Sequence, residues 1–133
     1  MAQPNLEDAL HTALSAITPV TDIVGTQIRS YRARETWDRP YITYEEASSV
    51  TPNIVTSDMI NSVFRIHCFE NTPALARVLE DAVYDGLHES TLTIAGWTNY
   101  WLAHEGRQHL IVDDDGTVYF HYIGDYRIKA DNQ

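Results

Sequence analysis

The amino-acid sequence predicts an α+β fold, in which a mixed or antiparallel β-sheet carries two amphipathic helices packed on one face. Three observations lead to this prediction. Apolar and polar residues alternate over residues 62–69, an amphipathic helical pattern follows at residues 73–87, and a similar pattern lies near the start of the chain. Each pattern has one main apolar face, so the sheet and the helices are expected to bury these faces against each other.

Length and composition limit both architecture and function. With 133 residues the chain has room for one domain, which is expected to span residues 1–133. Its apolar runs stay below the roughly 18 residues that a membrane span needs, and its start lacks the features of a signal peptide. Synthesis in a cytoplasm and no membrane partner are therefore expected. The formal net charge of −10 argues against nonspecific contacts with nucleic-acid phosphates, and no specific nucleic-acid binding is expected.

The chain begins with helical patterns. Asn5 can cap a helix over residues 6–17, whose apolar side chains recur every three or four positions. A further helical turn is expected at residues 20–24. Gly25 is suited to end that turn, because glycine adopts positive φ without strain.

Two strands and two connections are predicted next. Residues 26–31 form a short strand with Ile28 facing the core, and residues 41–45 form a second strand of high β-propensity. The charged residues 32–40 form the loop between them. Residues 48–57 form a polar connection that is longer than a tight hairpin needs, and such loops often make contacts.

Residues 62–88 are the central packing unit. On the strand, the side chains that face the core are Phe64, Ile66 and Cys68, and the opposite face, which carries Arg65 and His67, is expected to be partly covered or to be a contact surface. Thr72 is a good N-cap and Pro73 suits the first position of the helix that follows. The stripe expected to lie on the sheet comprises Leu75, Val78, Leu79, Ala82, Val83 and Leu87. The exposed face is expected to carry Arg77, Glu80, Asp81, Tyr84 and Asp85.

Past residue 88 the pattern is that of β-strands. Short apolar pieces are expected at residues 92–95, 97–103 and 110–112. Residues 113–116, with the sequence Asp-Asp-Asp-Gly, predict a hairpin turn. A long final strand is expected over residues 117–129, bent at Gly124.

Residues that could carry chemistry lack a recognisable spacing. The aspartates of the predicted turn precede a glycine, as in a calcium loop, but the alternating ligands and final glutamate of an EF-hand are missing, so an acidic turn is favoured. The six histidines lack the spacing of a zinc site. His67 and Cys68 point to opposite faces of a strand and cannot act together as base and nucleophile. The sequence predicts no catalytic residue, cofactor or metal.

Two groups of polar and aromatic residues have a possible functional interpretation. His104 and Glu105 could act with Asp113 as acid and base in a cleft, although a chain this acidic offers such combinations by chance. The aromatic side chains of Trp97, Tyr100 and Trp101 could stack on bases, but the negative charge of the chain favours a core or interface role.

The uneven distribution of charge points to contacts between proteins. Within residues 29–39 lie Arg29, Arg32, Arg34 and Arg39, and a basic patch on an acidic body suits head-to-tail self-association. On the second helix Asp81 and Asp85 lie four residues apart, where like charges repel, so an acidic patch that meets Arg32 or Arg34 of a neighbouring copy is predicted. The candidate interface residues are Arg29, Arg32, Arg34, Trp37, Arg39, Pro52, Asn53, Asp81, Asp85, Asp113, Asp114 and Asp115.

In this order of elements, the chain resembles the tail-completion, or tail terminator, proteins of long-tailed bacteriophages. The resemblance rests on the patterns at residues 6–17, 20–25, 27–29, 40–44, 64–69, 75–87 and 114–119. It implies a virion protein that forms a hexameric ring on the last ring of the tail tube, stops polymerisation and presents a surface to the head-tail connector protein. The implied partners are copies of itself, the tail tube protein and the connector, at the tail-head junction, with DNA passing through the ring.

Two alternatives remain open. The first is a different neck adaptor, such as a head-closure protein, which would bind filled heads in place of purified tail tubes. The second is a small enzyme that uses His104, Glu105 and Asp113, and a structure without a pocket around these groups would contradict it.

Overall fold

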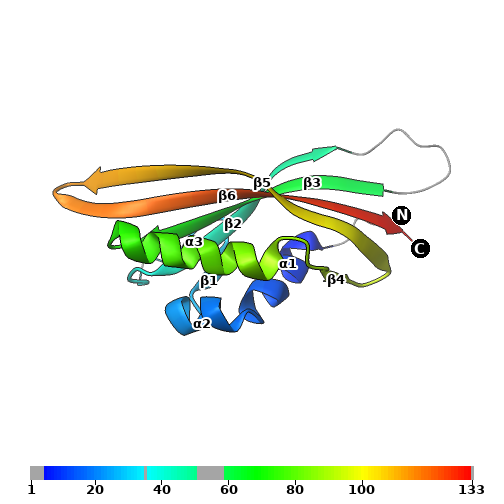
Figure 1. The fold of residues 1–133 in the computed structure, drawn as a ribbon, viewed down its shortest axis with the longest axis horizontal. Coiled ribbons are helices and arrows are strands. Elements are labelled where there is room, and N and C mark those ends of the chain that lie inside the picture. Colours follow the sequence, from blue (N-terminus) through cyan, green and yellow to red (C-terminus); the bar gives the residue numbers. More distant parts are fainter. Residues whose placement is uncertain (1–4, 35, 51–58, 133) are drawn as a thin grey trace.

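The computed structural model describes residues 5–34, 36–50 and 59–132. Over these residues, helices α1 (Leu6–Ser15), α2 (Thr18–Val24) and α3 (Pro73–Leu87) lie on one side of a curled six-stranded sheet (Figure 1). The strands are β1 (Ile28–Ser30), β2 (Tyr41–Val50), β3 (Met59–Glu70), β4 (Thr93–Ile94), β5 (Trp97–Asp114) and β6 (Thr117–Asn132). The α+β class with a mixed sheet is confirmed. None of the described helices is long and apolar enough to cross a membrane.

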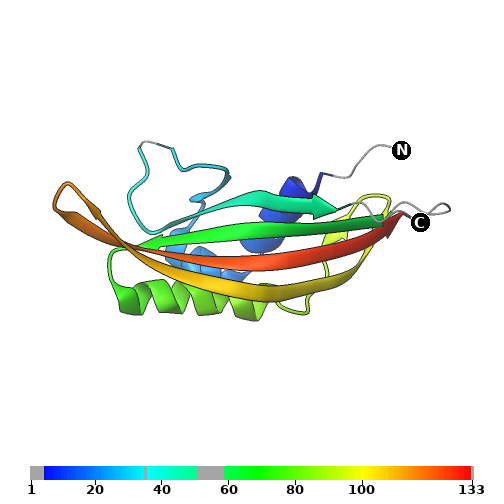
Figure 2. The same cartoon turned by 90° about the horizontal axis from the view of Figure 1, so that it is seen from above.

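The sheet has the strand order β1-β2-β3-β6-β5-β4. β1 pairs with β2 in parallel, and the other neighbours are antiparallel. Figure 2 shows the four long strands side by side along the length of the molecule. The last strand, β6, lies in the middle of the sheet between β3 and β5, so the C-terminal part of the chain completes the core.

The N-terminal helices form as the sequence predicts. The side chain of Asn5 accepts a hydrogen bond from the backbone N–H of Asp8 at 3.0 Å and caps α1. α1 ends at Ser15, two residues before the predicted end, since Ile17 serves as the N-cap of α2. Gly25 closes α2 with φ 61°, the positive value for which glycine is suited.

Helix α3 begins as predicted but presents a rotated face. The Thr72 hydroxyl accepts a hydrogen bond from the N–H of Leu75 at 3.2 Å, which confirms the cap. The buried residues are Ala76, Leu79, Glu80, Val83 and Leu87. Leu75 and Val78, predicted inside, are half-exposed, and Glu80, predicted outside, is buried. The helix turns this way because β5 offers polar partners to Glu80, as described below.

β5 differs most from the prediction. The expected separate pieces at residues 97–103 and 110–112 are one strand of 18 residues that pairs along β6, with register shifts between Asn99 and Trp101 and between His104 and Gly106. The polar residues between the two pieces obscure the strand pattern, because side chains on both of its faces have charged partners. β2 likewise continues to Val50, into the predicted polar connection.

The core lies between the sheet and the helices. Phe64, Ile66 and Cys68 are buried there, as the alternation of β3 predicts. The other face of β3 is partly covered, since Val63 is buried and Phe69 is half-buried. Ion pairs cross this open face: Arg65 Nε to Asp125 Oδ1 at 3.0 Å, and Arg127 Nε to Glu105 Oε2 at 2.7 Å.

The predicted aspartate turn joins β5 and β6. Asp115 and Gly116 have φ of 52° and 88°, the positive values that a two-residue hairpin loop requires. Asp113 Oδ1 accepts a hydrogen bond from the N–H of Gly116 at 3.0 Å. The backbone geometry of the turn therefore accounts for Asp and Gly at its two central positions.

Candidate functional site

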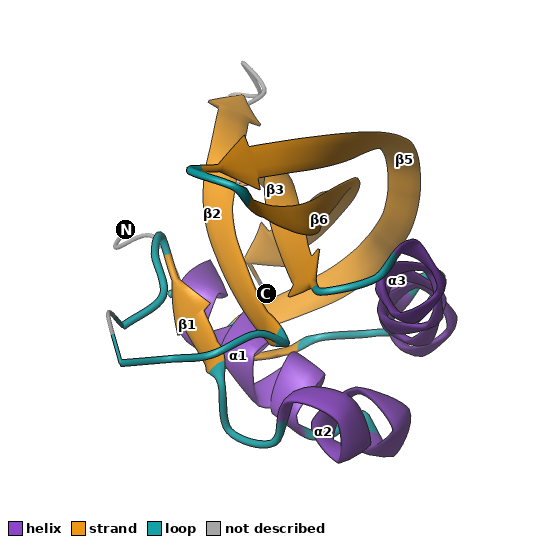
Figure 3. Ribbon diagram, turned by 90° about the vertical axis from the view of Figure 1, so that its left-hand side faces the viewer, coloured by secondary structure: helices purple, strands orange, loops and turns teal. Residues whose placement is uncertain are grey.

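The arginine-rich stretch lies on the β1 flank of the sheet, opposite the flank that carries α3 (Figure 3). Arg29, Arg32 and Arg34 are exposed, and none of them forms an ion pair with another described residue. We call these three residues and Tyr31, which is 61% exposed, the arginine segment. Its cations are available to a partner.

Arg39 and Trp37 have internal contacts instead. Arg39 Nε donates a hydrogen bond to Asn71 Oδ1 at 2.8 Å, and the guanidinium lies 4.6 Å from the ring centroid of Tyr119. The Trp37 ring is half-buried, with its centroid 6.2 Å from that of Tyr41. These two predicted contact residues hold the end of the loop against the sheet.

The predicted acidic patch on α3 is partly used within the chain. Asp81 Oδ1 lies 3.6 Å from Arg77 Nε, an exposed pair four residues apart, and Asp85 is exposed. Such exposed pairs contribute little to stability. Of the two aspartates, Asp85 is the one that leaves its carboxylate without a cation from its own described chain.

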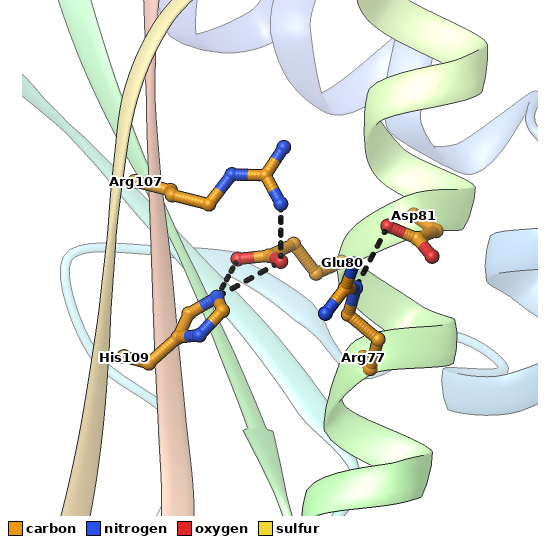
Figure 4. A network of polar contacts seen from close by, with 5 residues as sticks. All are labelled: Arg77, Glu80, Asp81, Arg107 and His109. Carbon is orange, nitrogen blue, oxygen red and sulfur yellow. Dashed lines mark hydrogen bonds and ion pairs between the residues drawn. The ribbon is translucent and has the colours of Figure 1, made fainter.

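A polar cluster between α3 and β5 was not predicted from sequence (Figure 4). The Glu80 side chain is 7% exposed, and its Oε2 accepts a hydrogen bond from His109 Nε2 at 2.8 Å, while Oε1 lies 3.4 Å from Arg107 Nη1. The His109 ring stacks on Tyr122 with centroids 3.7 Å apart. Arg107 and His109 lie two residues apart on β5, so their side chains point to the same face. Their spacing predicts this shared face only after residues 97–114 are recognised as one strand. The cluster ties α3 to β5.

A second unpredicted cluster lies on the open face of the sheet. His67 Nε2 lies 2.8 Å from Glu45 Oε1, and His67 Nδ1 lies 2.6 Å from His121 Nε2, so β2, β3 and β6 are linked. The His121 ring also stacks on Phe69 at 4.2 Å. The hydrogen bond between the two rings contains one proton, donated by one ring nitrogen and accepted by the other. The two rings therefore cannot both be charged while this bond persists.

Acid is expected to destabilise the fold through this cluster. Burial, and then the neighbouring His67, lower the pKa of His121 to about 4. The unfolded chain, with an ordinary histidine pKa of about 6.5, binds more protons between pH 6.5 and 4. The stabilisation is therefore present above pH 6.5 and lost as the pH falls toward 4, by on the order of 2 kcal/mol.

This expectation is checked by urea unfolding at a series of pH values for wild type and His121→Gln. The variant should lose less stability than wild type between pH 6.5 and 4. His11→Gln is the matched control, because His11 lies on α1, outside the cluster. Parallel pH profiles of wild type and His121→Gln would contradict the assignment.

The three residues of the enzyme alternative do not converge. The His104 ring packs edge-on against Tyr84 and Tyr126, while Glu105 binds Arg127 on the open face. Asp113 lies nine residues further along β5, roughly 30 Å away at the rise of a strand. A cleft of about 430 Å³ does lie beside His104, but neither Glu105 nor Asp113 lines it. Its other lining residues are His88, Glu89, Ser90, Thr91, Trp101, Leu102 and Ala103.

The remaining predicted residues lie in the core, at the hairpin tip and outside the described residues. Cys68 is buried, and burial raises the pKa of its thiol. Asp113, Asp114 and Asp115 are exposed at the hairpin tip. Across the described ranges, no three His, Cys, Asp or Glu side chains are grouped so that they could hold a metal ion. Pro52 and Asn53 lie outside the described residues.

Comparisons with known proteins agree with this arrangement. Eighteen chains of solved structures match the fold. One belongs to a structure described as the virion of a native gene transfer agent (GTA) particle, with a TM-score of 0.80 and 16% sequence identity over 95% of this chain and 94% of that chain. No curated protein sequence matches.

A family model supplies the sequence evidence. The model described as tail completion protein gp17 matches residues 8–130, which is nearly the whole chain. This match confirms the resemblance to tail-completion proteins that the order of helices and strands indicates. The chain therefore belongs to the tail completion protein gp17 family.

Proposed function

We propose that this chain is a structural virion protein that caps the head-proximal end of a phage tail tube as a ring, expected to be hexameric. The ring ends tube polymerisation and presents the surface to which the head-tail connector protein joins. The family match over residues 8–130 is the observation that carries this proposal. In it the whole chain acts as one domain, without catalysis, at the tail-head junction.

The charges of the two flanks support ring formation. A ring of identical subunits needs a heterologous contact, in which two different surfaces of each copy meet. One flank carries the exposed cations of the arginine segment, and the other flank carries α3 with Asp81 and Asp85 (Figure 3). Copies of this chain can therefore attract each other head to tail.

The overall charge suits a ring through which DNA passes. At −10 per copy, the ring repels phosphate groups. On the open face of the sheet Arg65 and Arg127 are already paired with carboxylates of the same chain. These arginines are thereby less available to hold DNA, so movement of DNA without specific binding is expected.

Reversing the charge of the arginine segment is expected to prevent ring formation. In the double variant Arg32→Glu and Arg34→Glu, each contact carries like charges in place of opposite ones, and the defect is repeated at every interface. Light scattering should show a monomer at concentrations where wild type forms rings, and tails assembled with the variant should have uncontrolled lengths. Arg77→Glu on α3 is the control for one charge reversal and is compared with Arg32→Glu alone. It should not weaken assembly, because it makes the acidic flank more negative. Unchanged assembly would remove the arginine segment from the contact without touching the family assignment.

The function itself is tested by binding to purified parts of the particle. The protein is mixed separately with tail tubes and with filled heads, and negative-stain images record where it lies. We expect a ring at one end of each tube, and tube subunits added afterwards should not extend that end. Binding to filled heads alone would favour a head-closure adaptor and contradict the proposal.

A further inference from the structure

The hairpin between β5 and β6 extends past the start of α3, which leaves its helix-facing side uncovered (Figures 1 and 2). On that side Ile111 is 73% exposed and Val118 is 47% exposed. The strand register places both side chains on one face. Ile111 and Asp113 lie two residues apart on β5 and point the same way, and their partners on β6 are Phe120 and Val118. The hairpin thus presents an apolar patch that none of the described residues covers.

Single exposed apolar residues are common, but this pair has a particular setting. Both side chains are β-branched and lie next to the tip, where Asp113, Asp114 and Asp115 are exposed. We call Ile111, Val118 and these three aspartates the acidic hairpin. Apolar groups bordered by charge of one sign are suited to a protein surface with exposed apolar groups and the opposite charge.

The arginine segment has those properties. It offers three exposed cations on the same stretch of chain as the exposed ring of Tyr31, against three carboxylates and two apolar side chains on the hairpin. α3 is a poorer counterpart for the arginine segment, because Asp81 already lies 3.6 Å from Arg77 and one aspartate, Asp85, remains. The acidic hairpin and the arginine segment lie toward the same end of the molecule (Figure 2).

We propose that the acidic hairpin of one copy docks on the arginine segment of the next copy. This inference rests on the ring proposed above and names the two surfaces that meet in it. The contact is heterologous, so each copy offers its hairpin to one neighbour and its arginine segment to the other. Copies related by rotation about a ring axis parallel to the long axis of the molecule present the two surfaces at the same level.

Cross-linking between two variants tests the contact directly. Copies with Ile111→Cys and copies with Arg32→Cys, carrying tags of different mass, are mixed and treated with a short bismaleimide. The native Cys68 is buried and is expected to stay unmodified. A cross-linked pair with one copy of each tag is expected. Val78→Cys replaces Arg32→Cys in the control, since Val78 is an exposed apolar position on α3.

Charge exchange gives an independent measurement. Asp113→Arg, on the same face of β5 as Ile111, is expected to raise the concentration for half-maximal assembly at least tenfold, and adding Arg32→Glu should restore it. Asp85→Arg, on α3, should have a smaller effect. Ile111→Thr keeps a β-branched side chain and should also weaken assembly, whereas Val112→Thr, on the other face of the same strand, should not.

Three results would overturn the inference. The first is cross-linking of position 111 to position 78 but not to position 32. The second is assembly that is insensitive to both Asp113→Arg and Ile111→Thr. The third is a wild-type protein that stays monomeric at every concentration. If tubes are still capped while these hairpin variants assemble normally, the proposed function stands and the hairpin contact falls. If the cross-link forms but the protein does not bind tubes, the hairpin contact stands and the proposed function falls.

Discussion

Replacing Arg107 by Met and His109 by Phe in one variant is expected to lower the free energy of unfolding by about 3–5 kcal/mol. Both partners of the Glu80 carboxylate are then lost, and a side chain only 7% exposed is left without a cation or a hydrogen-bond donor. Phe at position 109 retains a ring to stack on Tyr122, so the packing of the strand is preserved. Urea unfolding followed by circular dichroism measures the loss.

Two controls separate an unpaired charge from general damage. Arg77→Met breaks the exposed pair with Asp81 on the same helix and should change the free energy of unfolding by less than about 0.5 kcal/mol. Adding Glu80→Met to the double variant should recover most of the loss, because no buried charge remains. If the triple variant is as unstable as the double variant, the cluster stabilises the fold by packing, and the electrostatic account is wrong.

Phe64→Ala is expected to cost about 3–5 kcal/mol, while the same substitution at Phe69 costs on the order of 1 kcal/mol. Phe64 is 1% exposed between the sheet and the helices, so its removal leaves a cavity that the packed core cannot fill. Phe69 is half-buried on the open face of the same strand, where solvent can replace part of the lost contact. Denaturant midpoints and slopes of the two variants give the comparison.

The pair of substitutions shares residue type, strand and secondary structure, so only the face of β3 differs. A cost at Phe69 equal to that at Phe64 would mean that the open face is covered as fully as the core. In that case the sheet would have to bury two faces within one chain, contrary to the partial exposure of Arg65 and Phe69.

Local signals by themselves determined the caps, the hairpin turn and the inward face of β3. The side chains of Asn5 and Thr72 satisfy N–H groups within three residues, and Asp115 and Gly116 adopt positive φ in a two-residue loop. These interactions join residues that are close in sequence, so the pattern of residue types contains them. The alternation of β3 is equally local, because successive side chains of a strand point to opposite faces.

The tertiary structure decided which face of α3 is buried and how β5 continues. Glu80 lies inside because Arg107 and His109, 27 and 29 residues away in sequence, contact it from β5. The strand that carries them is hidden in the sequence, since its polar residues find their partners only after β6 has paired with it. The link from Glu45 through His67 to His121 likewise joins three strands. A buried polar group is stable only with partners of suitable geometry, and local sequence patterns do not encode contacts between residues far apart in the chain.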